Sequence, residues 1–347
     1  MKRRIKPSLR TSIIGLLLIC SCFTIQGQQL TPESLGFNPY QVDHKTLGEV
    51  NFYITSNGLE KSKPVLLYLD GSGAFPLFQM MEQGIGSSVI INFSELSEQY
   101  HVVIISKPDV PFIDSLRMDS KTGYPLYDRP EGYTQNLSLD WRVSAAQTAL
   151  DFIFDNTPID TTKVVAMGIS EGFQVGAKLA SVDSRISHLI LMVGNGLNQY
   201  FDFIIQNRMD AYAGDITEAE SQKNIDSLFK ISQSIALEPK NTDKEWYGHS
   251  YLRWSSFTKE SPAHSILSLD IPIYLVGCSK DRNSSVLGTD YLYLESLTKG
   301  KTNITYRVYP YDHSFNEQIL DEEGRVVSFQ NHRTEVLGEA FEWLVNN

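Results

Sequence analysis

The sequence predicts a three-layer α/β sandwich, in which helices cover both faces of a mostly parallel β-sheet. Short runs rich in Val, Ile and Tyr recur along the chain, and their hydrophobicity is continuous, as in strands that are buried on both faces. Between these runs, apolar residues follow the period of a helix. This alternation implies right-handed crossovers that place helices on both sides of the sheet. At 347 residues, the chain fits one domain with an insertion.

Seven apolar runs are predicted to be strands, because each is four to eight residues long and bounded by turn residues. The first of them is expected to add an outer strand to the sheet. The runs are 51–55, 64–70, 101–107, 163–169, 188–193, 271–278 and 303–310.

Helical spacing is clearest between the third and fourth of these runs. After Ser170, Gly172 and Gly176 lie four residues apart and would let a second helix approach the sheet closely. A last amphipathic helix follows the final strand. The crossover helix places on one face Leu139, Val143, Ala146, Leu150 and Ile153, and the last helix carries Val336, Ala340, Phe341 and Leu344.

Residues 196–268 are more chain than a single crossover helix needs. We interpret them as a helical cap insertion over the C-terminal edge of the sheet, where α/β folds bind ligands. The alternative is a helical insertion on the side of the domain, with its aromatic residues as a local core. Those residues are Tyr200, Phe201, Phe203, Trp246, Tyr247, Tyr251, Trp254 and Phe257.

The N-terminus reads as a secretory signal peptide over residues 1–27. Five basic residues among the first ten precede an apolar run from Ile13 to Ile25, which is too short to span a bilayer comfortably. We expect cleavage after Gly27, so that residues 28–347 form the α/β domain of an exported protein, periplasmic or secreted. Two alternatives stay open: a lipoprotein anchored to the membrane through Cys22, and a retained signal anchor.

The composition excludes one class of partner. The chain has 30 basic and 41 acidic residues, a net charge of −11, and removal of residues 1–27 takes five basic and no acidic residues, which gives −16. Such a surface repels phosphate, so we expect no nucleic-acid partner. Cys278 is the one cysteine of the predicted mature chain, and we interpret it as a small buried apolar residue.

The pentapeptide Gly168-Ile169-Ser170-Glu171-Gly172 is the main chemical motif. It follows an apolar run directly and opens a helix, which is the setting that a nucleophile elbow requires. The two glycines are expected because the strained turn leaves no room for side chains on either side of Ser170. The other interpretation is a structural turn whose serine caps the helix.

A nucleophilic serine needs a base, and the base needs an acceptor that fixes its tautomer. His313 follows the last predicted strand and is our candidate base, with His332 as the rival. Asp281 follows the run at 271–278, so its carboxylate is expected at the same sheet edge as Ser170. Asp312 is badly placed to reach the ring of its neighbour.

The order Ser170, Asp281, His313 in these loop contexts resembles the α/β-hydrolase fold superfamily, in its esterase and prolyl-oligopeptidase-like branches. The resemblance extends from Pro64 to the C-terminus, apart from the insertion. It implies an eight-stranded, mostly parallel sheet and an acyl-enzyme mechanism. It does not identify the substrate.

The resemblance also implies an oxyanion hole, in which each backbone N–H donor is worth about 3 kcal/mol. One donor is expected from Glu171, at a helix N-terminus. The other is expected after the run at 64–70, from Ser72 with Gly71 close behind. Many relatives have His where this chain has Asp70.

The sequence leaves the roles of two acidic side chains open. The Glu171 carboxylate could bind a cationic or hydroxyl-bearing leaving group or simply stabilise the helix dipole, and Asp109 faces the same predicted edge. No cofactor or metal is expected: Pro76 interrupts the only glycine-rich loop that resembles a dinucleotide site, and no paired Cys or His ligands occur.

We therefore expect a serine hydrolase that acts on a small-molecule or glycan-linked carboxylic ester. A serine peptidase of prolyl-oligopeptidase type is the alternative enzyme. A non-catalytic binding protein on the same fold is the alternative from another class.

Overall fold

The computed structural model describes residues 30–82, 84–121 and 125–347. The predicted signal peptide, its cleavage point and Cys22 lie outside the described residues. The chain divides into two units, Met1–Leu30 and Thr31–Asn347, and the described helices and strands belong to the second. In these described ranges, no helix is both long enough and apolar enough to cross a membrane.

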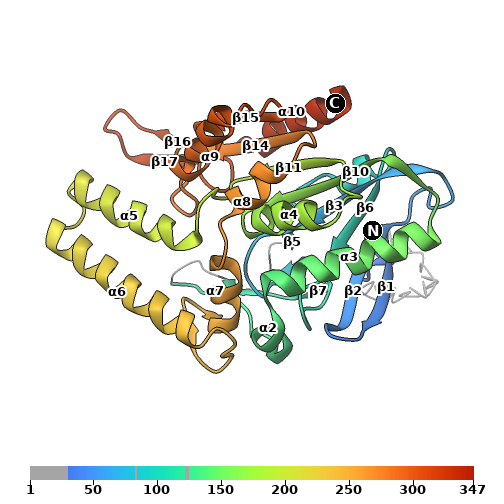
Figure 1. Ribbon diagram of the computed structural model, residues 1–347, viewed down its shortest axis with the longest axis horizontal. Coiled ribbons are helices and arrows are strands. Elements are labelled where there is room, and N and C mark those ends of the chain that lie inside the picture. The colour runs from blue at the N-terminus through green and yellow to red at the C-terminus, as the bar shows by residue number, and fades with distance from the viewer. Residues whose placement is uncertain (1–29, 83, 122–124) are drawn as a thin grey trace, which may run out of the picture. The chain divides into compact units, whose positions relative to one another are not determined.

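An eight-stranded mixed sheet forms the centre of Thr31–Asn347 (Figure 1). Strand β2 pairs antiparallel with both of its neighbours, and the remaining pairs are parallel, so the predicted mostly parallel eight-stranded sheet is confirmed. In sheet order the strands are β1 (Phe37–His44), β2 (Gly48–Thr55), β6 (His101–Ile105), β3 (Lys63–Leu69), β10 (Ile159–Ile169), β11 (His188–Met192), β14 (Ile273–Cys278) and β15 (Ile304–Tyr309).

Each of the seven predicted runs contributes to a strand of this sheet, but the first is not the outer one. Residues 51–55 belong to β2, and β1 covers its free edge. Along β1 only Phe37 is buried, and half-buried and exposed residues alternate after it. The prediction was wrong here because such a strand has no continuous apolar run.

Both faces of the sheet are covered by helices. Val65, Leu67 and Leu69 of β3 join the cluster under α3 (Leu139–Asn156), α4 (Glu171–Val182), α8 (Pro262–Ser268) and α9 (Val286–Thr298). Leu66 and Tyr68 point the other way, into the cluster under α1 (Phe93–Leu96) and α10 (Arg333–Asn346). Burial on both faces explains the continuous hydrophobicity of the strand.

Helix α4 lies unusually close to the sheet. A Cβ atom added to Gly172 would lie 2.0 Å from the carbonyl oxygen of Leu69. One added to Gly176 would lie 3.1 Å from the Cδ2 atom of Leu191. The backbone of α4 therefore packs on the C-terminal end of β3, as the spacing of the glycines predicts.

The 196–268 insertion is largely helical. It contains α5 (Gln199–Ala213), α6 (Glu218–Leu237) and α7 (Tyr251–Thr258), with a small hairpin of β12 (Glu245–Trp246) and β13 (His249–Ser250) before α7, and it ends with α8 on the main sheet. Helices α5 and α6 lie side by side and extend away from the main sheet (Figure 1). Thr217 and Glu220 form a capping box that starts α6.

Several short elements outside the main sheet were not predicted. Most are two to six residues long and partly exposed, so neither the helical nor the strand period of hydrophobic residues is visible in the sequence. They are η1 (Glu33–Leu35), the sheet of β4 (Phe78–Met81), β5 (Gly84–Ser87) and β7 (Ile113–Ser115), the pair β8 (Arg117–Met118) and β9 (Pro125–Leu126), α2 (Glu131–Asn136), and the hairpin of β16 (Asn316–Leu320) and β17 (Val326–Asn331).

We expect Gly172→Ala to lower the free energy of unfolding by about 3 kcal/mol or more, because the new methyl group would overlap a backbone carbonyl that cannot move away. Gly338→Ala is the matched control, since Gly338 lies exposed in α10 with no atom within 4 Å of the added Cβ. It should raise the free energy of unfolding by about 0.5–1 kcal/mol. Urea unfolding measures both, and equal effects would contradict the close approach of α4.

Candidate active site

Ser170 occupies a strained turn between β10 and α4. Its φ is 55° and its ψ is −117°, a backbone conformation that residues other than glycine rarely adopt. The turn is held by the N–H of Ser170, which donates to the carbonyl oxygen of Met192 at 3.0 Å. A Cβ atom on Gly168 would lie 2.0 Å from the carbonyl oxygen of Gly172, so both glycines of the pentapeptide are sterically required. This is the geometry of a nucleophile elbow.

The structure brings Ser170, His313 and Asp281 together. The Nε2 atom of His313 lies 3.0 Å from Ser170 Oγ, and its Nδ1 atom lies 2.7 Å from Asp281 Oδ2. The other oxygen of Asp281 accepts the N–H groups of Asn283 and Ser284 at 2.7 and 2.9 Å. A carboxylate on Nδ1 fixes the tautomer whose Nε2 can accept the serine proton.

Parallel strands explain why these distant residues meet. Ser170 follows β10, Asp281 follows β14 and His313 follows β15, and these strands point the same way in one sheet. Their C-terminal ends therefore share an edge, which is where α/β folds place ligand sites.

The other sequence candidates lie elsewhere. His332 precedes α10 and contacts Glu335 and Glu317, and Asp312 accepts backbone N–H groups of its own turn. Asp109 is exposed beside α2 and does not line the cavity that contains Ser170. Cys278 is buried, and its burial raises the pKa of the thiol to about 12. It suits packing better than nucleophilic attack.

The loop Asp70-Gly71-Ser72 lies against Ser170. A Cβ atom on Gly71 would lie 3.3 Å from Ser170 Cβ, so the loop backbone passes at van der Waals distance from this side chain. Ser72 and Glu171 both line the cavity beside Ser170. The three residues expected to build the oxyanion hole are therefore neighbours of Ser170, and their role as donors stays a prediction.

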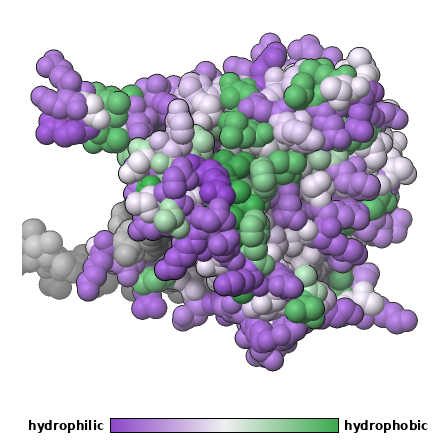
Figure 2. Space-filling model, turned by 60° about the vertical axis from the view of Figure 1, so that its left-hand side comes forward, coloured by the Kyte–Doolittle hydropathy of each residue, from purple (hydrophilic) through white to green (hydrophobic). Residues whose placement is uncertain are grey.

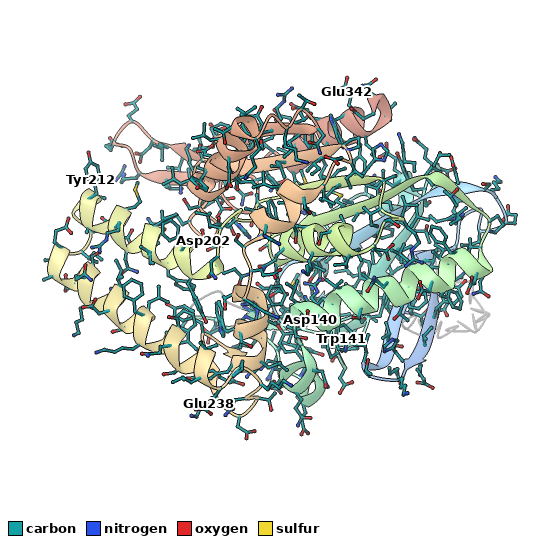
Figure 3. The ribbon with its side chains drawn as sticks, in the orientation of Figure 1. Asp140, Trp141, Asp202, Tyr212, Glu238 and Glu342 are labelled. Carbon is teal, nitrogen blue, oxygen red and sulfur yellow. The ribbon has the colours of Figure 1, made fainter. Side chains whose placement is uncertain are left out.

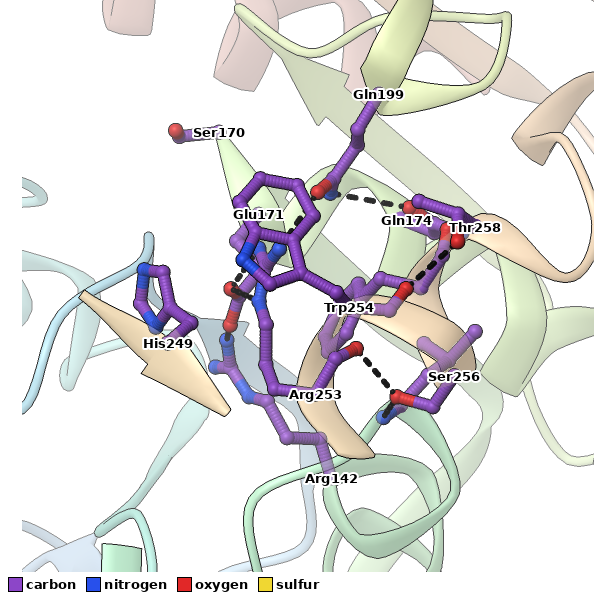
Figure 4. A network of polar contacts seen from close by, with 12 residues as sticks. Arg142, Ser170, Glu171, Gln174, Gln199, His249, Arg253, Trp254, Ser256 and Thr258 are labelled. Atoms are coloured by element: carbon purple, nitrogen blue, oxygen red, sulfur yellow. Dashed lines mark hydrogen bonds and ion pairs between the residues drawn. The ribbon is translucent and has the colours of Figure 1, made fainter. Parts of the chain in front are cut away.

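Five charged side chains form a buried cluster next to Ser170. Figure 4 shows three of them, Arg142, Glu171 and Arg253. Asp70 pairs with Lys107 and with Arg142, each at 2.5 Å. Arg142 also pairs with Glu171 at 2.9 Å, and the second oxygen of Glu171 lies 2.5 Å from Arg253. None of these side chains is more than 6% exposed. Sequence analysis missed the cluster, because its members are scattered between positions 70 and 253.

The cluster decides the role of Glu171. Burial alone would raise the pKa of this carboxyl, but the guanidinium groups of Arg253 and Arg142 outweigh it and hold the pKa well below its usual range. The carboxylate is thus ionised, and both of its oxygens are held by arginines. Of the two interpretations left open for this side chain, the contacts favour neither a leaving-group site nor the helix dipole alone, because its partners are the two arginines.

Asp202 on α5 is a second acidic group near the triad. It lies at the end of α5 nearer the sheet, whereas Tyr212 marks the far end (Figure 3). Its Oδ1 accepts hydrogen bonds from Asn195 and from the N–H of Ser285, which leaves Oδ2 able to hold a proton. Burial, reinforced by the charge of Asp281, raises the pKa of Asp202 to about 7. No motif in the sequence marked this residue.

A cavity of about 820 Å³ opens above Ser170 and His313, within the size range of ligand pockets. The insertion supplies much of its wall through α5, α6, α7 and the β12–β13 hairpin. In Figure 2 the side that carries α5 and α6 is turned forward, and a band of hydrophobic residues runs through a mostly hydrophilic face. Insertion residues on the cavity wall include Phe203, Gln206, Asn207, Trp246, Tyr247, His249, Arg253 and Trp254.

His249 adds a neutral polar group to this wall. Burial, reinforced by the nearby Arg253 charge, lowers the pKa of its imidazole to about 4. Its Nδ1 lies 3.4 Å from the hydroxyl of Tyr133. Among the residues that the structure describes, no group of three or more His, Cys, Asp or Glu side chains could hold a metal ion.

Comparisons with known proteins find similarity in structure alone. No family model matches the chain, and no curated relative matches its sequence. An acylaminoacyl peptidase of Pyrococcus horikoshii superposes with a TM-score of 0.51 at 14% identity, over 80% of this chain and 38% of that chain. An esterase of Pyrococcus furiosus gives 0.47 at 14% identity, over 92% of both chains. This chain thus spans less than half the length of the peptidase.

We expect Asp202→Asn to remove a pH dependence of stability. The pKa of Asp202 is about 7 in the folded chain and about 4 when unfolded, so its contribution is complete below pH 4 and is lost as the pH rises to about 7. Between pH 4 and about pH 7, the free energy of unfolding of the wild type should therefore fall relative to that of the variant. Above pH 7 the difference between the two should stay constant. Urea unfolding across pH 4–8 tests this, and curves that are parallel throughout would refute it.

Proposed function

The chain has the α/β-hydrolase fold, and we propose that it is a serine hydrolase that cleaves carboxylic esters through an acyl-enzyme intermediate. One observation carries the proposal: His313 lies within hydrogen-bond distance of both Ser170 and Asp281, and Ser170 sits on a strained turn at the floor of a large cavity.

The proposed reaction follows from these positions. His313 Nε2 takes the proton of Ser170 as Oγ attacks the ester carbonyl carbon, and Asp281 stabilises the imidazolium that forms. The N–H groups of Ser72 and Glu171 hold the negative oxygen of the tetrahedral intermediate. His313 then gives its proton to the alcohol oxygen, the C–O bond breaks, and a water activated by His313 releases the acid from Ser170.

An ester fits this site better than a peptide with a free N-terminus. A free peptide ammonium group would need an ionised carboxylate on the cavity wall. Glu171 has both oxygens bound by arginines, Asp210 pairs with Arg282, and the pKa of Asp202 is raised to about 7. The cavity wall offers aromatic rings in Phe203, Trp246 and Tyr247, with amides in Gln206 and Asn207 beside them. Such a wall suits an aryl ester or an ester of a glycan.

A peptidase that cleaves blocked peptides is the second candidate. One structure with a similar fold is an acylaminoacyl peptidase solved with Z-Gly-Gly-Phe-chloromethyl ketone, which superposes with a TM-score of 0.50 at 13% identity. The triad geometry serves amide cleavage equally well.

The first test is chemical labelling. We expect a fluorophosphonate probe to modify the wild-type chain once, at Ser170, and to leave Ser170→Ala unmodified. A separate sample of the wild-type chain, not treated with the probe, is then assayed on short-chain aryl esters, acetylated sugars and N-acylated peptide amides. Absence of labelling would refute the hydrolase proposal, and turnover of the amides alone would replace the ester substrate by a peptide.

The second test concerns the acid of the triad. Asp281→Asn preserves the shape of the side chain but can hold the wrong tautomer of His313, so kcat should fall by about 10⁴-fold. Circular dichroism should show an unchanged fold. Asp312→Asn is the matched control, because Asp312 bonds only within its own turn and Asn316. A near-normal rate for Asp281→Asn would assign the role to another carboxylate.

A further inference from the structure

We propose that Arg142 is a positioning residue that fixes the two halves of the oxyanion hole relative to each other, an inference that rests on the proposed function. Two segments flank Ser170 and supply the expected N–H donors: the loop from Asp70 to Ser72, and Glu171 at the start of α4. Arg142 bonds to both segments.

Arg142 donates hydrogen bonds to three acceptors. Nη1 of Arg142 donates to the backbone carbonyl oxygen of Asp70 at 3.0 Å and to Glu171 Oε1 at 2.9 Å. Nη2 donates to Asp70 Oδ1 at 2.5 Å. The backbone contact matters most, because it holds the peptide unit that leads into Gly71 and Ser72. One planar guanidinium thereby sets the distance between the loop and the first residue of α4.

Arg142 is itself held rigidly. It lies in the first turn of α3, where the side chain of Ser138 caps the helix and Trp141 and Val143 are buried against the sheet. Its side chain is only 6% exposed. A loop can shift, whereas a residue fixed in this way supplies a stable reference for both donors.

The geometry requires an arginine in particular. Three acceptors in two segments require N–H donors on separate nitrogens that are held in one plane, as in a guanidinium. A lysine ammonium has one nitrogen at the end of a flexible chain. The cluster contrasts the two: Lys107 reaches Asp70 alone, whereas Arg142 bridges Asp70 and Glu171. Lysine at position 142 would keep the charge but lose the bridge.

The net charge of the cluster favours the same role. With every group ionised, Lys107, Arg142 and Arg253 outnumber Asp70 and Glu171 by one positive charge. This excess lies next to Ser170 in a region closed to water, where it favours the negative charge that develops on the substrate oxygen. Arg142→Met removes that excess as well as the bridge, whereas Arg142→Lys removes the bridge alone.

Arg253 offers an internal comparison. It lies on α7 of the insertion and binds Glu171 Oε2 through Nε and Nη2 at 3.1 and 2.5 Å, while its Nη1 donates to Gln199 at 2.9 Å. It makes no bond to the described part of the loop. Its loss should therefore affect how the insertion is held more than it affects the oxyanion loop.

The test uses the full chain with Arg142→Lys, Arg142→Met and the control Arg185→Lys, whose arginine pairs with Asp183 and Asp151 outside the site. We measure kcat and KM on an aryl ester, fluorophosphonate labelling, and affinity for phenylboronic acid, which forms a tetrahedral adduct with serine. For Arg142→Met we expect kcat to fall by about 10²–10³-fold, with KM within about threefold and a parallel loss of boronate affinity. For Arg142→Lys we expect at least a tenfold fall. The Arg185 variant should keep wild-type kcat.

The outcomes separate the two claims. Wild type that the fluorophosphonate does not label overturns the hydrolase proposal and this inference with it. Labelled wild type together with a folded Arg142→Met whose kcat stays within threefold overturns the positioning role alone. A fall in kcat without loss of boronate affinity overturns it too, since that pattern reports a general structural effect. If the Met variant fails to fold, Arg142→Lys decides by the same criteria.

Discussion

Ser170 keeps a positive φ of 55°, and the surrounding structure has to hold it there. A conformation of this kind costs of the order of 1–3 kcal/mol and persists only where neighbouring parts of the fold leave no alternative. Three contacts prevent the backbone at Ser170 from relaxing to a more common conformation. Gly172 packs on the end of β3, Gly168 faces the carbonyl of Gly172, and the N–H of Ser170 is bound by Met192 at the end of β11. The position of Ser170 thus depends on the parallel sheet itself.

The buried charges extend this constraint to the loop opposite Ser170. Burial of a charge is expensive unless it is paired and hydrogen-bonded, and each carboxylate of the cluster meets that condition with two cations. Replacement of such a cluster by apolar residues is often neutral or stabilising. Stability therefore explains it poorly. The charged side chains instead fix the positions of the Asp70 loop, α4 and the insertion relative to one another, which apolar side chains could not do as specifically.

The insertion contributes to the site in two ways. Through Arg253 it contacts Glu171, the residue next to Ser170, and the guanidinium carbon of Arg253 lies 4.5 Å from the ring centroids of both Trp254 and Phe257. Through α5, α6 and the β12–β13 hairpin it also forms much of the cavity wall. Tyr247 lines that wall with a φ of 48° in a two-residue turn where Asn or Gly is usual, so its ring is held in place at a backbone cost.

The sequence by itself determined seven of the eight strands of the sheet, the crossover helices, the turn at Ser170 and the places of Asp281 and His313 after their strands. Each of these leaves a local signal: continuous apolar runs mark strands buried on both faces, helical spacing marks α3 and α10, and the two glycines mark a turn without room for side chains. Only the tertiary structure decided the rest. Strand β1 is half-exposed and has no apolar run, and the pKa of Asp202 is raised by burial in the folded chain and by the charge of Asp281. The pairing of Arg142 with Asp70 and Glu171 joins residues 72 and 29 positions apart. Ion pairs across such separations leave no period in a sequence, because they depend on where the strands and helices bring charged side chains together.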